Sequence, residues 1–146
     1  MKRRQLLILM LGIALLILFT VLATSLDSLF PPPTSATVQV AQAGPYQISF
    51  SVNPNPPHVA QVAALTVHII NKETQQSIDN AHVTLAISML TMDMGTDTVT
   101  AQSQASGMYR GTYQFSMSGS WAVHIAIAMP GQPVQSTSFD VTVANS

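Results

Sequence analysis

The sequence predicts an all-β domain: an immunoglobulin-like, seven-stranded antiparallel β-sandwich behind one N-terminal transmembrane helix. From residue 44 onward, apolar and polar residues alternate with a period of two, and turn-forming residues interrupt this alternation at short intervals. After the apolar N-terminal run, no stretch has the three-to-four-residue spacing of an amphipathic helix. Seven such strands within about 100 residues are typical of a sandwich domain.

An uncharged run from Leu6 to Ala23 predicts the transmembrane helix. Its 18 residues would form a helix about 27 Å long, close to the roughly 30 Å hydrocarbon core of a bilayer. Lys2, Arg3 and Arg4 precede it, which by the positive-inside rule keeps the N-terminus in the cytoplasm and places the rest outside the membrane. A cleaved secretory signal is the alternative, although its apolar core is usually only about 7–15 residues long. Both interpretations export the domain.

The chain is expected to have three parts, namely residues 1–23 (basic start and anchor), 24–43 (a linker) and 44–146 (the sandwich). Three consecutive prolines in the linker favour an extended conformation. Val38 and Val40 fit either the end of this linker or a short first edge strand, and the sequence leaves both interpretations open.

The first three expected strands have clear alternation. Tyr46–Asn53 alternates apolar and polar residues, and a proline-rich stretch ends it because proline cannot donate to a strand ladder. Val62–Asn71 places leucine, valine and isoleucine on one face, and a polar loop follows. Ala81–Met89 repeats the pattern after this loop.

The last four expected strands are separated by short turns. Asp97–Gln104 has the weakest pattern, with one strong apolar residue. Met108–Met117 and Ser120–Met129 are joined by a Ser-Gly turn, and Trp121 in the second of them is the expected core anchor. Gln135–Val143 completes the domain after a turn that contains two prolines and a glycine.

The composition excludes several classes of function. Charged residues make up only 8% of the chain, and three of its five basic residues precede the apolar run. The exported part therefore lacks the basic surface that nucleic-acid binding requires. The absence of cysteine excludes disulfides, thiolate metal sites and cysteine nucleophiles. Because no nucleophile elbow, zinc-protease motif or phosphate-binding glycine loop occurs, we expect no enzyme activity.

One histidine and four methionines are the candidate metal ligands. Alternate loops of an antiparallel succession lie at the same end of a sandwich, and the loops after the first, third and fifth expected strands carry, at or near their edges, His58, Met89, Met92, Met94 and Met117. Thioether sulfur suits copper(I), and methionine is a more durable sulfur donor than a free thiol outside the cytoplasm. We therefore predict a Cu(I) site. Since the chain enters the first expected strand from the opposite end, the site is expected to point away from the membrane.

The same methionines have a structural explanation. Methionine often fills gaps in cores, and Met89 and Met117 continue the inward-facing rows of their strands. Met92 and Met94 lie in a loop, where a core role is less automatic. The alternative function is therefore a protein-interaction or structural module that docks on another membrane protein through a weakly charged surface.

Several motifs in this order resemble a known family: Asn53-Pro54-x-Pro56, Met89-x-x-Met92-x-Met94, Gly107-x-Tyr109-x-Gly111 and Phe115-x-Met117-x-Gly119-x-Trp121. Over residues 45–143 the chain resembles the YtkA-like domain, which is similar to the extracytoplasmic part of FixH-type proteins. The resemblance implies a small β-sandwich outside a bacterial membrane, often behind one membrane helix. FixH-like relatives are associated with assembly of copper-containing respiratory oxidases, so we expect a copper-containing oxidase or an exporter as partner. Many relatives carry proline in the methionine-rich loop, where this chain has Leu90-Thr91.

Overall fold

The computed structural model describes residues 10, 12, 13, 15 and 37–145. The chain divides into two units, Met1–Thr34 and Ser35–Ser146. In the described residues of the first unit the backbone is helical, but no helix among the described residues is long and apolar enough to cross a membrane. Most of the run from Leu6 to Ala23 lies outside the described residues, so the transmembrane helix stays a prediction.

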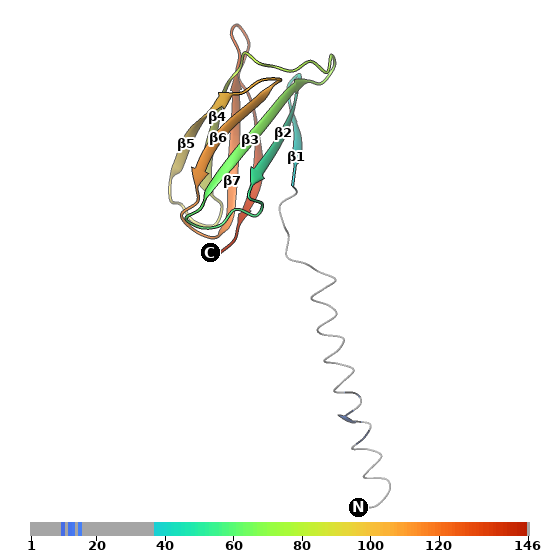
Figure 1. Ribbon diagram of the computed structural model, residues 1–146, viewed down its shortest axis with the longest axis vertical. Helices are drawn as coiled ribbons and strands as arrows, with labels where there is room; N and C mark the ends of the chain where they lie inside the picture. The colour runs from blue at the N-terminus through green and yellow to red at the C-terminus, as the bar shows by residue number, and fades with distance from the viewer. Residues whose placement is uncertain (1–9, 11, 14, 16–36, 146) are drawn as a thin grey trace, which may run out of the picture. The chain divides into compact units, whose positions relative to one another are not determined.

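The second unit contains eight strands: β1 (Gln39–Ala43), β2 (Tyr46–Asn53), β3 (Val62–Asn71), β4 (His82–Met89), β5 (Thr96–Ser103), β6 (Met108–Gln114), β7 (Gly119–Ala128) and β8 (Gln135–Val143). Their order in the sheet is β1-β2-β3-β6-β5-β4-β7-β8, and every neighbouring pair is antiparallel (Figure 1). The all-β antiparallel class is confirmed. The expected number of seven strands is wrong, because β1 adds an eighth.

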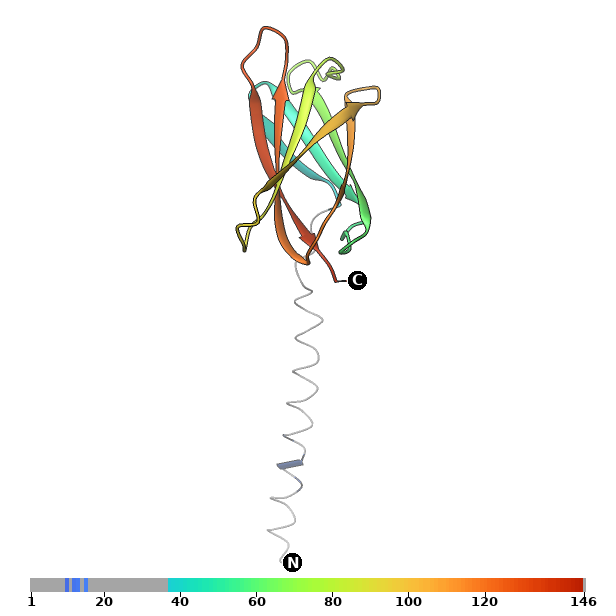
Figure 2. The same cartoon turned by 90° about the vertical axis from the view of Figure 1, so that its left-hand side faces the viewer.

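The eight strands form one continuous sheet that nearly closes on itself. β5 pairs with β4 along most of its length and reaches β6 only through the pairs Gln102–Arg110 and Ser103–Tyr109. On the other side, the Gln39 side-chain amide donates a hydrogen bond of 2.6 Å to the carbonyl oxygen of Asp140, which holds β1 beside β8. Figure 2 shows the strands wrapping around their core. The domain is therefore closer to a barrel than the expected open two-sheet sandwich.

The core consists of the inward-facing rows that the alternation predicts. Among the described residues, all buried apolar side chains lie between residues 43 and 143, and no polar or charged residue is buried. Phe50 stacks on Phe139 with 5.2 Å between the ring centroids, which joins β2 to β8. Residues 37–145 thus contain a complete hydrophobic core of their own.

β1 settles the open question about the end of the linker, because residues 39–43 are a strand. The larger apolar side chains Val38 and Val40 are exposed, whereas the smaller Ala41 and Ala43 pack on the core. β1 pairs with β2 from Gln39 opposite Phe50 to Ala43 opposite Tyr46. Since β1 runs antiparallel to β2, the chain enters the domain at the end where β2 finishes.

Candidate metal site

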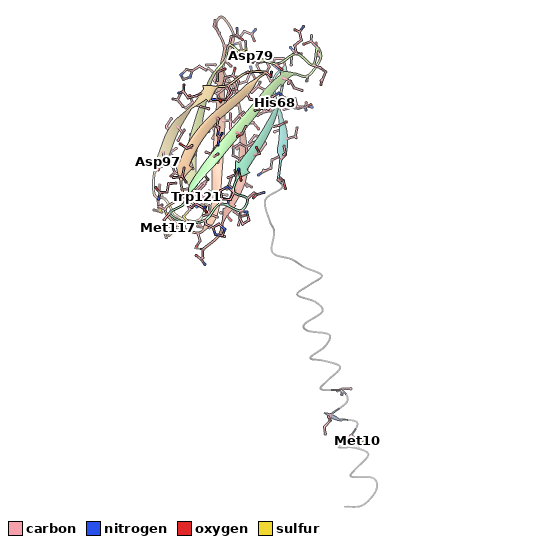
Figure 3. The ribbon with its side chains drawn as sticks, viewed as in Figure 1. Met10, His68, Asp79, Asp97, Met117 and Trp121 are labelled. Carbon is pink, nitrogen blue, oxygen red and sulfur yellow. The ribbon has the colours of Figure 1, made fainter. Side chains whose placement is uncertain are left out.

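Three loops bring the candidate ligands to one end of the domain. The β2–β3, β4–β5 and β6–β7 connections lie at this end, and we call it the methionine end, defined by His58, Met89, Met92, Met94 and Met117. Figure 3 shows Met117 there beside Trp121, while His68 and Asp79 lie at the opposite end. The antiparallel order thus places these loops together as expected. The chain does enter β2 from the opposite end, as expected, but β1 precedes β2 and starts at the methionine end, so the chain enters the domain there.

The methionines differ in how accessible their sulfur-bearing side chains are. Met92, Met94 and Met117 are 46%, 51% and 38% exposed. Met89 is partly buried and packs on the core, and its methyl carbon lies so close to Gly119 that a Cβ there would stand 3.0 Å away. Met89 therefore has the structural role that its place in a strand suggests, whereas the other three face solvent.

A pocket of about 390 Å³ in the β4–β5 connection brings two of the candidates together. Met89 and Met92 both line it, along with Asp93, Gly95 and neighbouring residues. Met94, Met117 and His58 are not among its lining residues. The structure thus places all five candidates at one end and two of them, Met89 and Met92, in this pocket.

His58 is held in an orientation suited to metal binding. Its Nδ1 lies 2.8 Å from the carbonyl oxygen of Asn145, which accepts a hydrogen from it. This bond leaves the lone pair of the neutral ring on Nε2, the arrangement common for histidine ligands. The loop itself is fixed to the end of β8, because Ala144 donates to the carbonyl oxygen of Pro57 and accepts from the amide of Val59.

Hydrogen bonds also tie the loops of the methionine end to one another. The amide of Ala60 donates a hydrogen bond of 3.0 Å to the carbonyl oxygen of Phe115. The indole of Trp121 donates one of 3.1 Å to the carbonyl oxygen of Met117. Both acceptors follow β6, which ends at Gln114 rather than at the predicted Met117. The strand is shorter than expected because these carbonyl oxygens accept hydrogen bonds from a loop and a side chain rather than from a neighbouring strand.

The donor set at this end is soft. Within residues 37–145 and the four described residues before them, no three His, Cys, Asp or Glu side chains gather to hold a metal ion. Asp93 accepts from the amide of Gly95 at 3.3 Å, consistent with the turn-forming role of aspartate. A calcium or zinc site would need more oxygen, imidazole or thiolate donors than this end offers, whereas thioether sulfur suits Cu(I).

Two exposed apolar residues at the methionine end were not singled out by the sequence analysis. Val62 and Leu90 are both more exposed than any of the candidate ligands. In the sequence, Val62 marks only the start of an expected strand, and Leu90 only a departure from the family pattern. The sequence feature that could have identified them is an apolar residue at the start of a strand (Val62) or in a loop (Leu90).

Tyr113 and Asp97 form a hydrogen-bonded pair near this end. The Tyr113 hydroxyl donates to Asp97 Oδ2 over 2.6 Å. Burial, and then the hydrogen bond to this carboxylate, raise the pKa of Tyr113 from 10.0 to about 12.

Between those pH values the unfolded chain loses the tyrosine proton while the folded chain keeps it. The free energy of unfolding is therefore expected to fall as the pH rises through this window, and the fall should be shallower in Tyr113→Phe. Denaturant unfolding at a series of alkaline pH values measures it, and an ultraviolet titration that finds Tyr113 ionising near pH 10 would contradict it.

The fold and the loop arrangement define a class: a small, nearly closed antiparallel β-domain with a methionine-rich end. The family model of YtkA-like proteins matches residues 40–126, and the chain belongs to this family. The resemblance seen in the sequence is thus confirmed. The match begins within β1, which makes that strand part of the family domain.

Two solved structures share the fold. A DUF4426 family protein from Pseudomonas aeruginosa PAO1 is 17% identical, with a TM-score of 0.51 over 73% of this chain and 94% of that one. The PmoD soluble domain from Methylocystis sp. ATCC 49242 (Rockwell) is 12% identical, with a TM-score of 0.50 over 75% of this chain and 98% of that one. The comparison with curated proteins gave no match. At these identities the likeness concerns the fold.

Proposed function

We propose that this chain is a membrane-anchored extracytoplasmic module that binds copper(I) through its methionine-rich loops and delivers it to a partner. The observation that carries the proposal is the convergence of three loops that expose Met92, Met94 and Met117 at one end of the domain. His58 lies on one of the same loops, with its Nδ1 hydrogen donated to a backbone oxygen.

The chemistry of this end favours a soft monovalent ion. Thioether sulfur carries no charge and is a good ligand for Cu(I), and an imidazole nitrogen complements it. Exposed ligands on loops also suit transfer, because a partner can reach the ion without the domain unfolding. A copper-containing oxidase or an exporter is the kind of partner that would receive or supply such an ion.

Replacing Met92 and Met94 together with leucine is expected to weaken Cu(I) binding at least about tenfold, or ~1.4 kcal/mol. Leucine keeps the apolar volume but removes the sulfur, so the change tests ligation rather than packing. The measurement is a titration of residues 37–146 with Cu(I) under reducing conditions against a chromogenic Cu(I) chelator.

Met108→Leu is the matched control, since Met108 is similarly exposed at the opposite end and its loss should leave the affinity unchanged. Equal affinities for the wild-type domain and the Met92/Met94 double variant would remove the proposal. A domain that binds no copper but still captures a membrane protein would instead favour the interaction module.

A further inference from the structure

Exposed apolar side chains are concentrated at the methionine end. In residues 37–145, six of the exposed large apolar residues lie at this end: Val38, Val62, Leu90, Met92, Met94 and Met117. Val40 follows along β1, and only Met108 and Val134 lie at the opposite end. A copper site does not explain why valine and leucine side chains are exposed at this end, because they cannot bind a metal ion. A concentration of this kind marks a surface that contacts an apolar phase or partner.

The charges at the two ends decide what kind of surface this end fits. The basic residues of the described domain are Lys72, which follows β3 at the opposite end, and Arg110, which pairs with Gln102 where β5 meets β6. The methionine end carries Asp93 and Asp97 instead. Attraction to anionic headgroups is therefore absent, and contact with a neutral lipid surface would depend on the apolar side chains.

The course of the chain favours the bilayer as occupant. β1 begins at the methionine end, so the residues before it leave the domain from that end. They include the uncharged run from Leu6 to Ala23, and only residues 24–38 separate this run from β1. Fifteen residues reach at most about 50 Å when fully extended. A tether this short gives the domain a high effective concentration at the bilayer surface, so that even weak contacts with lipid can form.

We propose that the methionine end rests on the neutral surface of the bilayer in which Leu6–Ala23 is proposed to anchor the chain, with Val62 and Leu90 entering the lipid interface. The proposal goes beyond copper binding and does not require it. It also gives the exposed valine and leucine a role that a metal site does not.

The absence of cysteine makes the test direct, because a single introduced cysteine can be spin-labelled uniquely. The full chain is placed in phosphatidylcholine nanodiscs with the label at Val62→Cys, Leu90→Cys or Val134→Cys. Val134 is the matched control, since it is 62% exposed at the opposite end and Val62 is 61% exposed. A label at Met10→Cys reports whether the chain is anchored.

The readout is the accessibility of each label to oxygen, which concentrates in lipid, relative to a water-soluble nickel chelate. We expect a several-fold higher ratio at positions 62 and 90 than at 134, and a smaller difference when phosphatidylglycerol is added. Equal ratios at the three positions, or a water-exposed label at position 10, would overturn the proposal. Labels that become protected only in native membranes would also overturn it, in favour of a protein partner.

Two pairs of variants separate this surface from the copper site. Met92→Leu with Met94→Leu keeps the apolar character, so lipid contact should persist while copper binding weakens. Val38→Ser with Val62→Ser changes two exposed side chains of this end that do not line the pocket of Met89 and Met92. This pair should lower the oxygen preference of a label at Met117→Cys while leaving copper affinity, measured without that label, unchanged. Failure of one proposal is thus distinguishable from failure of the other.

Discussion

Replacing Trp121 with alanine is expected to destabilise the domain by roughly 3–5 kcal/mol. The indole is buried in the core, with its ring centroid 5.3 Å from that of Phe115 and 6.3 Å from that of Tyr113. Both contacts have the edge-to-face geometry that aromatic pairs prefer. Truncation would leave a cavity at the centre of this cluster and remove the donor to the carbonyl oxygen of Met117.

Urea unfolding of residues 37–146, followed by circular dichroism, measures this loss of stability. Trp121→Phe is the control because it keeps an aromatic ring and loses mainly volume and the indole hydrogen bond, so it should cost clearly less than alanine. A loss below about 1 kcal/mol for the alanine variant, within the range of ordinary surface substitutions, would contradict the central role of the indole.

Gly107→Ala is expected to cost roughly 2–5 kcal/mol, combining left-handed backbone strain with a steric clash. Gly107 has a φ of +72°, and a Cβ there would lie 2.5 Å from the backbone oxygen of Ile69. Its amide donates to the carboxylate of Asp79, and its carbonyl oxygen accepts from the amide of Ile69 over 2.9 Å. The backbone nitrogen of Ile78 would lie 3.2 Å from the same Cβ, so backbone atoms of two residues leave the turn no room to shift.

Gly131→Ala separates the two contributions. Gly131 has a φ of +73°, but nothing lies within 4 Å of a Cβ built there. It should therefore show the conformational cost alone, about 1–2 kcal/mol. Equal losses of unfolding free energy in the two variants would mean that the contact with Ile69 has no effect.

Most of the strands that surround the core could be predicted from the sequence. β2, β3 and β8 have the predicted bounds, β4 begins one residue later than predicted, and β5 and β7 are each shifted by one residue at both ends. Their apolar residues alternate because one face of each strand is buried, and period two is a direct consequence of strand geometry.

β1 could not be assigned because its pattern is inverted. Its larger residue Val40 faces outward, and the small Ala41 and Ala43 face the core. The near-closure of the sheet also has no local signal, since the bond from Gln39 to Asp140 joins residues 101 positions apart. Contacts of this length depend on the completed topology rather than on sequence periodicity.

The position of the candidate site could be predicted in part, because it follows from the order of the strands. Antiparallel order alone brings the three loops to one end, which needs no knowledge of side-chain packing. β1 was not assigned from the sequence, and this one additional strand reverses the end at which the chain enters the domain. Side-chain placement, such as the pocket shared by Met89 and Met92, depends on loop conformations that strand alternation does not determine.

Because β8 finishes beside Gly119 and Ala144 bridges to His58, the last residues of the chain also emerge among the methionine loops. An affinity tag or fluorescent protein fused after Ser146 would therefore crowd the loops where copper and lipid are proposed to bind. The β7–β8 hairpin, whose exposed Gly131 has open space around it, offers an insertion point at the opposite pole. Reporter fusions placed there would leave both chain ends and the methionine loops unobstructed.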